Sequence, residues 1–150
     1  MVWPTQDTTR DEALKQVDLT ARRLKANSAV FRGEAAAGNI NADRITEEVL
    51  RNLVVARNTF TAAAAVPGMA AFVAAERSVT QQQVADDFNA MLGAVNAAIS
   101  WIAANMPKNG AGFLLIRSID AQGALTYRQF TPAETAGLRT ALLAVEATIG

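Results

Sequence analysis

Three pairs of neighbouring carboxylates are the first residues that could do chemistry: Asp11–Glu12, Glu47–Glu48 and Asp86–Asp87. Such a pair works as a general acid and base, or as metal ligands, only when both groups reach one atom. Neighbours on a helix point about 100° apart, so these pairs do not converge. A carboxylate metal centre in a helical bundle also uses a Glu-x-x-His pattern, and the sequence has no histidine. We therefore expect all three pairs on solvated helix faces.

The run PKNGAG at 107–112 is the nearest approach to a phosphate-binding loop. A P-loop follows a strand, opens a helix and contains glycine, lysine and then serine or threonine. Here the order is reversed, because a helical pattern comes before the loop and a strand pattern after it. Lys108 by itself does not make a phosphate site. The run is predicted to be a helix-to-strand turn.

Nucleophilic catalysis lacks its usual partners in this chain. A serine nucleophile needs an adjacent base, and without histidine none is evident for Ser28, Ser78, Ser100 or Ser118. The chain also has no cysteine, which excludes disulfides and thiolate metal sites. We therefore expect a protein that is not an enzyme, with no catalytic residue, no cofactor and no metal ligand.

Composition narrows the class further. The 150 residues carry 14 basic and 14 acidic side chains, so no excess positive charge attracts nucleic acid, and sequence-specific nucleic-acid binding is not expected. Hydrophobic residues make up 51%, which argues against disorder. The N-terminus does not read as a signal peptide. The apolar run around Pro67 and Gly68 is interrupted, and no stretch reaches the roughly 20 residues of a membrane helix. We expect one soluble domain, residues 1–150, made and used in a cytoplasm.

Two long helices are predicted in the first half of the chain. The first begins at Thr9, with Glu12 at the capping-box position, and ends by Gly33. Its apolar stripe contains Leu14, Val17, Ala21, Leu24, Ser28 and Phe31. The second has Asn41 as its N-cap and is stopped by Pro67. Its apolar face contains Ile45, Val49, Leu53, Ala56 and Phe60.

Three more helices are predicted in the second half. A short one covers about 68–77. The next begins after Thr80, which forms a capping box with Gln83, and ends before Pro107. Its wide stripe contains Val84, Phe88, Met91, Leu92, Val95, Ala98, Ile99 and Ile102. The last begins with Thr131, Pro132 and Glu134, and its stripe contains Leu138, Leu142, Val145 and Ile149.

A β-hairpin is predicted at about 113–130, where FLLIRSI and ALTYRQF flank a turn containing Gly123. The predicted fold is therefore mainly α: a single bundle of about five helices with one hairpin inserted before the C-terminal helix. Residues 113–116 are apolar on both faces of their strand, and both strands have open edges. Either the helices cover both faces within one monomer, or a neighbouring chain covers one of them. We favour assembly with a neighbour.

Candidate interface residues follow from the hairpin and from the N-terminus. Trp3 precedes any helix and either folds onto its own domain or docks on another. Arg117, Arg128 and Arg139 either keep the surface soluble, pairing with Asp120 or Glu134, or meet an acidic partner. The full set of predicted interface residues is Trp3, Phe113, Leu115, Arg117, Tyr127, Arg128 and Phe130.

The passages AAISWIAANMPKNGAGFLLI and TYRQFTPAETAGLRTALLAV resemble small structural proteins of tailed bacteriophages and prophages. The resemblance covers roughly the C-terminal half of the chain. It implies a non-enzymatic virion component, a neck or head-to-tail adaptor, that assembles in the host cytoplasm as a ring or symmetric array. Its partners would be copies of itself and portal, tail or capsid proteins, with no membrane. Two alternatives remain: a tail or capsid accessory protein, or a soluble helical binding or regulatory module that holds a peptide or small apolar ligand.

Overall fold

Helices make up most of the chain, as the composition predicts. The computed structural model describes residues 5–37, 42–105, 117–119, 121–123, 125–127 and 131–149. Five helices lie within these ranges: α1 (Thr5–Ala37), α2 (Ala42–Ala64), α3 (Met69–Arg77), α4 (Gln81–Asn105) and α5 (Pro132–Ile149). The mainly helical class is therefore confirmed.

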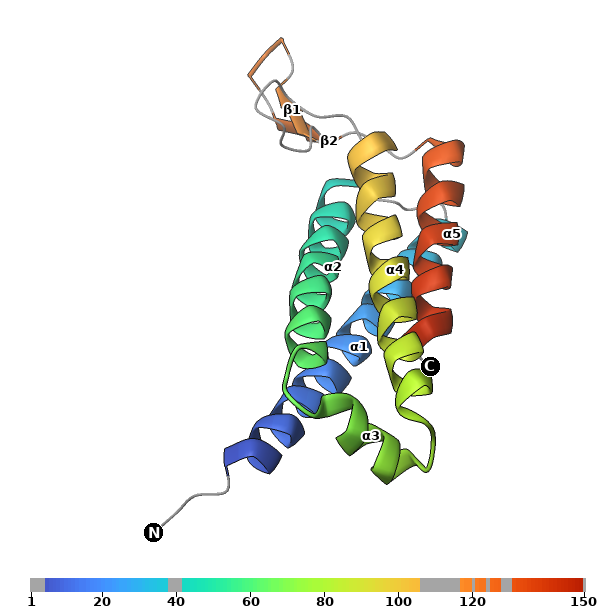
Figure 1. The fold of residues 1–150 in the computed structure, drawn as a ribbon. Coiled ribbons are helices and arrows are strands. Elements are labelled where there is room, and N and C mark those ends of the chain that lie inside the picture. Colours follow the sequence, from blue (N-terminus) through green and yellow to red (C-terminus); the bar gives the residue numbers. More distant parts are fainter. Residues whose placement is uncertain are drawn as a thin grey trace.

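The long helices form a bundle in which α1 crosses the others at an angle (Figure 1). α1 packs on α2 and α5, whereas α4 packs on α2, α3 and α5. α1 and α2 run antiparallel, because the Asn52 amide donates to Asn27 near one end and Arg10 donates to the Pro67 carbonyl near the other. The short helix α3 closes the lower end of the bundle in Figure 1.

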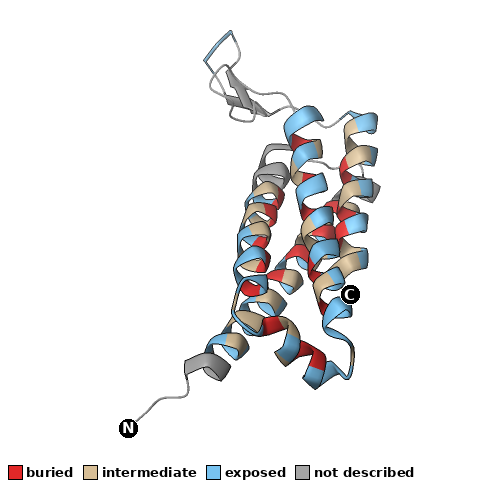
Figure 2. Ribbon diagram, viewed as in Figure 1, coloured by how far each residue is buried: buried red, intermediate tan, exposed pale blue. Residues whose placement is uncertain are grey.

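The core consists of the apolar stripes that the sequence predicts, turned inward (Figure 2). The larger cluster joins α1, α2, α4 and α5. Its buried members are Leu24, Phe31, Val49, Leu53, Ala56, Phe60, Val95, Ala98, Ile102, Leu138, Leu142 and Val145. A smaller cluster lies around α3, with Ala63, Met69, Val73, Ala74, Val84 and Phe88 buried. Val17 and Met91 pack against both clusters, so the two meet at these residues.

Two predicted capping boxes are present with both of their hydrogen bonds. At α4, the Gln83 amide donates to Thr80 Oγ1 at 3.1 Å, and the Thr80 amide donates to Gln83 Oε1 at 2.9 Å. At α5, the matching distances between Thr131 and Glu134 are 3.2 and 3.0 Å. Each box satisfies two backbone donors that the first helical turn leaves unpaired. The starts of α4 and α5 are therefore confirmed.

The predicted start and end of the first helix are wrong. α1 begins at Thr5 and continues to Ala37, so Thr9 lies inside the helix and Gly33 does not end it. Glu12 accepts a hydrogen bond from Gln16 at 3.2 Å, one turn later in the same helix. The Thr9–Glu12 spacing is equally compatible with a helix interior.

The turn between α2 and α3 follows the prediction from Pro67. α2 ends at Ala64, and Gly68 precedes α3 with φ 74°. This left-handed conformation is open to glycine without steric penalty. Arg10 of α1 lies against the same turn: its Nη1 donates to the Pro67 carbonyl at 3.1 Å, and its guanidinium lies 5.2 Å from the centre of the Phe72 ring. The N-terminal part of α1 is thus held to the α2–α3 corner.

Two short strands lie between α4 and α5. β1 (Arg117–Ile119) and β2 (Leu125–Tyr127) pair antiparallel, with Arg117 opposite Tyr127. Figure 1 draws them beyond the end of the bundle at which α4 ends and α5 begins. The hairpin predicted over 113–130 is longer than these six residues, and 113–116, 120, 124 and 128–130 lie outside the described residues. The longer hairpin stays a prediction.

Candidate functional site

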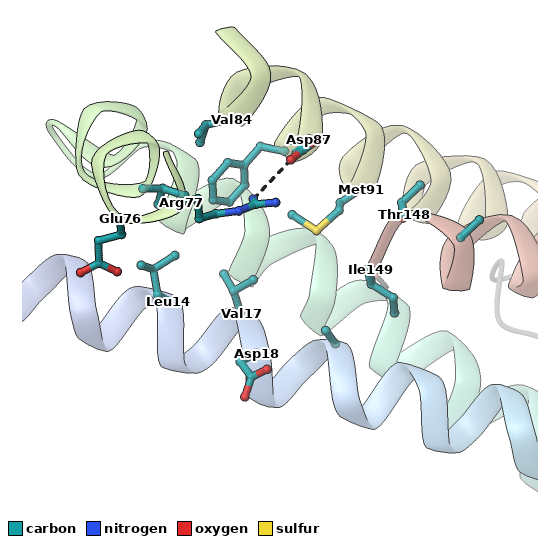
Figure 3. A pocket seen from close by; sticks show the side chains of 14 residues that line it. Leu14, Val17, Asp18, Glu76, Arg77, Val84, Asp87, Met91, Thr148 and Ile149 are labelled. Carbon is teal, nitrogen blue, oxygen red and sulfur yellow. Dashed lines mark hydrogen bonds and ion pairs between the residues drawn. The ribbon is translucent and has the colours of Figure 1, made fainter. Parts of the chain in front are cut away.

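A cleft of about 570 Å³ lies between α1, α3, α4 and the C-terminal end of α5 (Figure 3). Its lining is Leu14, Val17, Asp18, Ala21, Val73, Glu76, Arg77, Val84, Asp87, Phe88, Met91, Ala147, Thr148 and Ile149. This volume lies within the range of small-molecule sites, roughly 300–1,000 Å³. Apolar side chains form most of the walls, and the charged groups are exposed.

The last residues of α5, Ala147, Thr148 and Ile149, form one side of the cleft, beside the N-terminal parts of α4 and α1. α3 contributes Val73, which is buried, and Glu76 and Arg77, which are exposed. Val17 and Met91, where the two core clusters meet, face each other from α1 and α4 across the gap in Figure 3.

Charged side chains surround the cleft on three elements. Arg77 of α3 reaches Asp87 of α4, with Nη1 3.3 Å from Oδ2 (Figure 3). Asp18 is paired with Arg22 on its own helix at 3.0 Å. Both pairs are exposed, so each adds little to stability. Among the lining residues that the structure describes, there are three carboxylates and one guanidinium.

A second, shallower hollow of about 460 Å³ runs between α4 and α5. It is lined by Ala94, Ala97, Trp101, Ala136, Gly137, Thr140, Ala141 and Ala144. Its walls are almost entirely small residues and carry no charge. Trp101 is half-buried here and packs on the larger cluster from one side.

The outer face of α1 exposes two large apolar side chains. Leu19 is 43% exposed and Val30 is 54% exposed. They are 11 positions apart. In an α-helix this spacing amounts to about three full turns plus 20°, and to about 16 Å along the helix axis. Both therefore lie on one face, roughly opposite the side that buries Leu24 and Ser28. Val55 on α2 and Leu143 on α5 are the other exposed large hydrophobics in the described part of the chain.

The described residues do not bring acidic side chains together as metal ligands. Within the described residues no group of three or more aspartates and glutamates is placed to hold a metal ion. Asp11, Glu12, Asp86 and Asp87 are all exposed, as predicted. Ser28 is buried on α1, where its hydroxyl has no hydrogen-bond partner among the described residues.

No single described helix has both the length and the apolar character to span a bilayer. Only Glu48–Ala64 and Met69–Arg77 taken together meet those criteria, and a 90° bend separates them. The buried faces of both segments, including Phe60 and Met69, are already packed inside the bundle.

The predicted interface residues fall largely outside the described part of the chain. Trp3, Phe113, Leu115, Arg128 and Phe130 lie in undescribed segments. The backbones of Arg117 and Tyr127 are opposite each other in the strand pair, and their side chains are not described.

Arg139, from the predicted cationic set, is exposed on α5. Arg128 lies outside the described residues and the side chain of Arg117 is not described, so the role of the three arginines stays a prediction.

The cleft was not predicted from the sequence. Leu14, Val17 and Ala21 were assigned to the core stripe of the first helix, and they are only half-buried. The available signal was the short helix after Pro67, since a helix of nine residues cannot cover the full length of its longer neighbours.

Comparisons with family models, with curated proteins and with solved structures give no match to this chain.

Proposed function

We propose that this protein is a non-enzymatic assembly protein that works by packing against further copies of itself and against other structural proteins. The observation that carries the proposal is the outer face of α1, where Leu19 and Val30 are exposed on the side away from the core. Single exposed hydrophobics are common on protein surfaces. Two on one face of a 33-residue helix, with the exposed small residue Ala26 between them, form a strip that another helix can cover.

The strip suits contact with an identical surface. An antiparallel pair of α1 helices centred between Leu19 and Val30 would place Leu19 of one helix beside Val30 of the other. A two-fold contact of this kind is self-complementary, which is the commonest arrangement in homo-oligomers.

The segment 113–130 is proposed as a second contact. β1 and β2 form a two-stranded sheet, so each strand keeps one edge that is not paired within that sheet. Two-stranded sheets are marginally stable alone and gain from an added strand or a covering surface. In this proposal the sites of contact are Phe113, Leu115, Arg117, Tyr127, Arg128 and Phe130, together with Trp3.

The biological setting that we propose is the particle of a tailed bacteriophage, assembled in the host cytoplasm. The resemblance to phage structural proteins supports it, and a neck or head-to-tail adaptor is the role that the resemblance favours. A ring or other symmetric array would then use the α1 face and the hairpin as two different contacts, with portal, tail or capsid proteins as further partners.

The α1 contact is tested by placing charge on it. Leu19→Glu with Val30→Glu puts like charges at the centre of the strip, and like charges across an interface cost several kcal/mol. We expect the oligomer fraction in sedimentation velocity to fall about ten-fold or more. Ala29→Glu is the control, since Ala29 is exposed on the same helix about a quarter turn from the strip. If the double variant and the control sediment like the unmodified chain, the α1 contact is wrong.

The hairpin contact is tested separately by deleting Phe113–Phe130 and joining the flanking residues with a short glycine-serine linker. Circular dichroism should show that the helices still form, because the described core is built from helices alone. We expect assembly to stop at the species that the α1 contact can make. Full-size particles or rings formed without the segment would remove the hairpin from the proposal.

A further inference from the structure

We infer that the cleft between α1, α3, α4 and α5 binds an apolar molecule that carries one cationic head group, such as a long-chain amine. The inference rests on the lining of the cleft and is independent of the assembly proposal. The apolar part of the ligand would lie inside the cleft, and its positive charge would lie at the opening beside Glu76.

The apolar part of the ligand is specified by the walls. Leu14 and Val17 of α1 lie opposite Met91 of α4, and Ile149 of α5 closes one side (Figure 3). Phe88 of α4 also lines the cleft. These side chains lie where the two core clusters meet without filling the space between them. Methionine adapts its shape to different apolar contacts, so Met91 suits a flexible chain better than one rigid ring.

The charge of the ligand follows from which polar groups of the lining are already paired and which are not. Arg77, the one cation among the described lining residues, is directed at Asp87. The Thr148 hydroxyl already donates to the Val145 carbonyl at 2.8 Å. Asp18 is paired with Arg22. Glu76 makes no ion pair with any described residue, so one carboxylate at the opening has no matching positive charge.

The end of α3 adds to the same preference. Glu76 and Arg77 form the last turn of α3, and the C-terminal end of a helix carries partial negative charge. Arg77 is turned toward α4, which leaves the Glu76 side of this end uncompensated. A cationic head group is therefore favoured at the opening, and an anionic one is repelled.

The test compares three probes with one ten-carbon tail: decylammonium, 1-decanol and decanoate. The full chain is labelled with ¹³C at its methionine methyl groups, and Met91→Leu assigns the Met91 signal. Met91 lines the cleft, whereas Met69 is buried outside the lining and serves as an internal reference. We expect decylammonium to shift Met91 saturably and more than Met69. Its affinity should exceed that of 1-decanol by about two- to five-fold, the range of an exposed ion pair, and decanoate should bind weakest.

Two charge variants separate the head-group contact from general attraction to acidic protein. Glu76→Gln should lower decylammonium affinity by about two- to five-fold and leave 1-decanol unchanged. Asp86→Asn is the matched control, because Asp86 is exposed on α4 and outside the lining. Ala21→Trp should fill the cleft and weaken all three probes. If that variant does not fold, the two charge variants decide.

The inference is overturned if decanoate binds as well as decylammonium, if Met69 responds as strongly as Met91, or if Glu76→Gln and Asp86→Asn have the same effect.

Discussion

The indole of Trp101 on α4 lies directly against the backbone of Gly137 on α5. A Cβ atom built on Gly137 would lie 2.7 Å from Trp101 Cε2 and 2.9 Å from its Nε1. Such contacts are too close for carbon, so glycine at this position is what allows the two helices to meet across the tryptophan. The pair shows how the alanine-rich faces of this bundle gain packing area from a few large side chains.

Gly137→Ala should therefore destabilise the protein, although alanine is the better helix former by about 1 kcal/mol. We expect a loss of about 1–3 kcal/mol in the free energy of unfolding, the usual cost of overpacking. Gly93→Ala on α4 is the matched control, since a Cβ atom built on Gly93 would have nothing within 4 Å. It should stabilise by about 0.5–1 kcal/mol. Urea unfolding measures both, and equal gains for the two variants would contradict the Trp101 contact.

Arg10, which is half-buried, should contribute more to stability than the exposed arginines on α1. It donates to the Pro67 carbonyl at 3.1 Å and lies over Phe72. Arg10→Ala is expected to lower the free energy of unfolding by about 1–2 kcal/mol, from one hydrogen bond and one cation–π contact. Arg22→Ala removes only an exposed pair with Asp18 and should cost about 0.5 kcal/mol or less. Thermal unfolding of both variants decides the matter, and a smaller loss for Arg10→Ala would count against this anchoring role.

The ion pair between Arg32 of α1 and Glu146 of α5 should be energetically coupled. Arg32 Nη2 lies 2.8 Å from Glu146 Oε1, with the side chains 37% and 20% exposed. Only one oxygen and one nitrogen are engaged, because Glu146 Oε2 and Arg32 Nε are buried without partners among the described residues. A double-mutant cycle with Arg32→Met and Glu146→Gln should give a coupling of about 1 kcal/mol. The same cycle at Asp18 and Arg22 should give about half of that or less, and no difference between the cycles would show that partial burial adds nothing.

Much of the helical frame could be predicted because its signals are local. Thr80 with Gln83 and Thr131 with Glu134 form their capping boxes regardless of what the helices pack against. The stripes through Val49 and Leu138 became core because a helical period places their members on one side. The predicted helix start at Thr9 is wrong, because a threonine followed three residues later by a glutamate also occurs inside helices.

The cleft and the α1 strip depend on relations between elements, which local patterns do not contain. The cleft is lined by residues of four helices, α1, α3, α4 and α5, which the fold brings together. The exposure of Leu19 and Val30 follows only once it is known that no other described helix covers that face of α1. The sequence does contain one signal for the strip: Leu19 and Val30 are hydrophobic, lie outside the predicted core stripe and are 11 positions apart.

The most direct test of the assembly proposal is the mass of the unmodified chain in solution. Size-exclusion chromatography with light scattering should be run from about 1 μM to about 1 mM, which spans weak to moderate affinities. An assembly protein should reach a fixed multiple of 15.9 kDa as concentration rises. A mass of 15.9 kDa at every concentration, unchanged when purified portal or tail proteins are added, would contradict it.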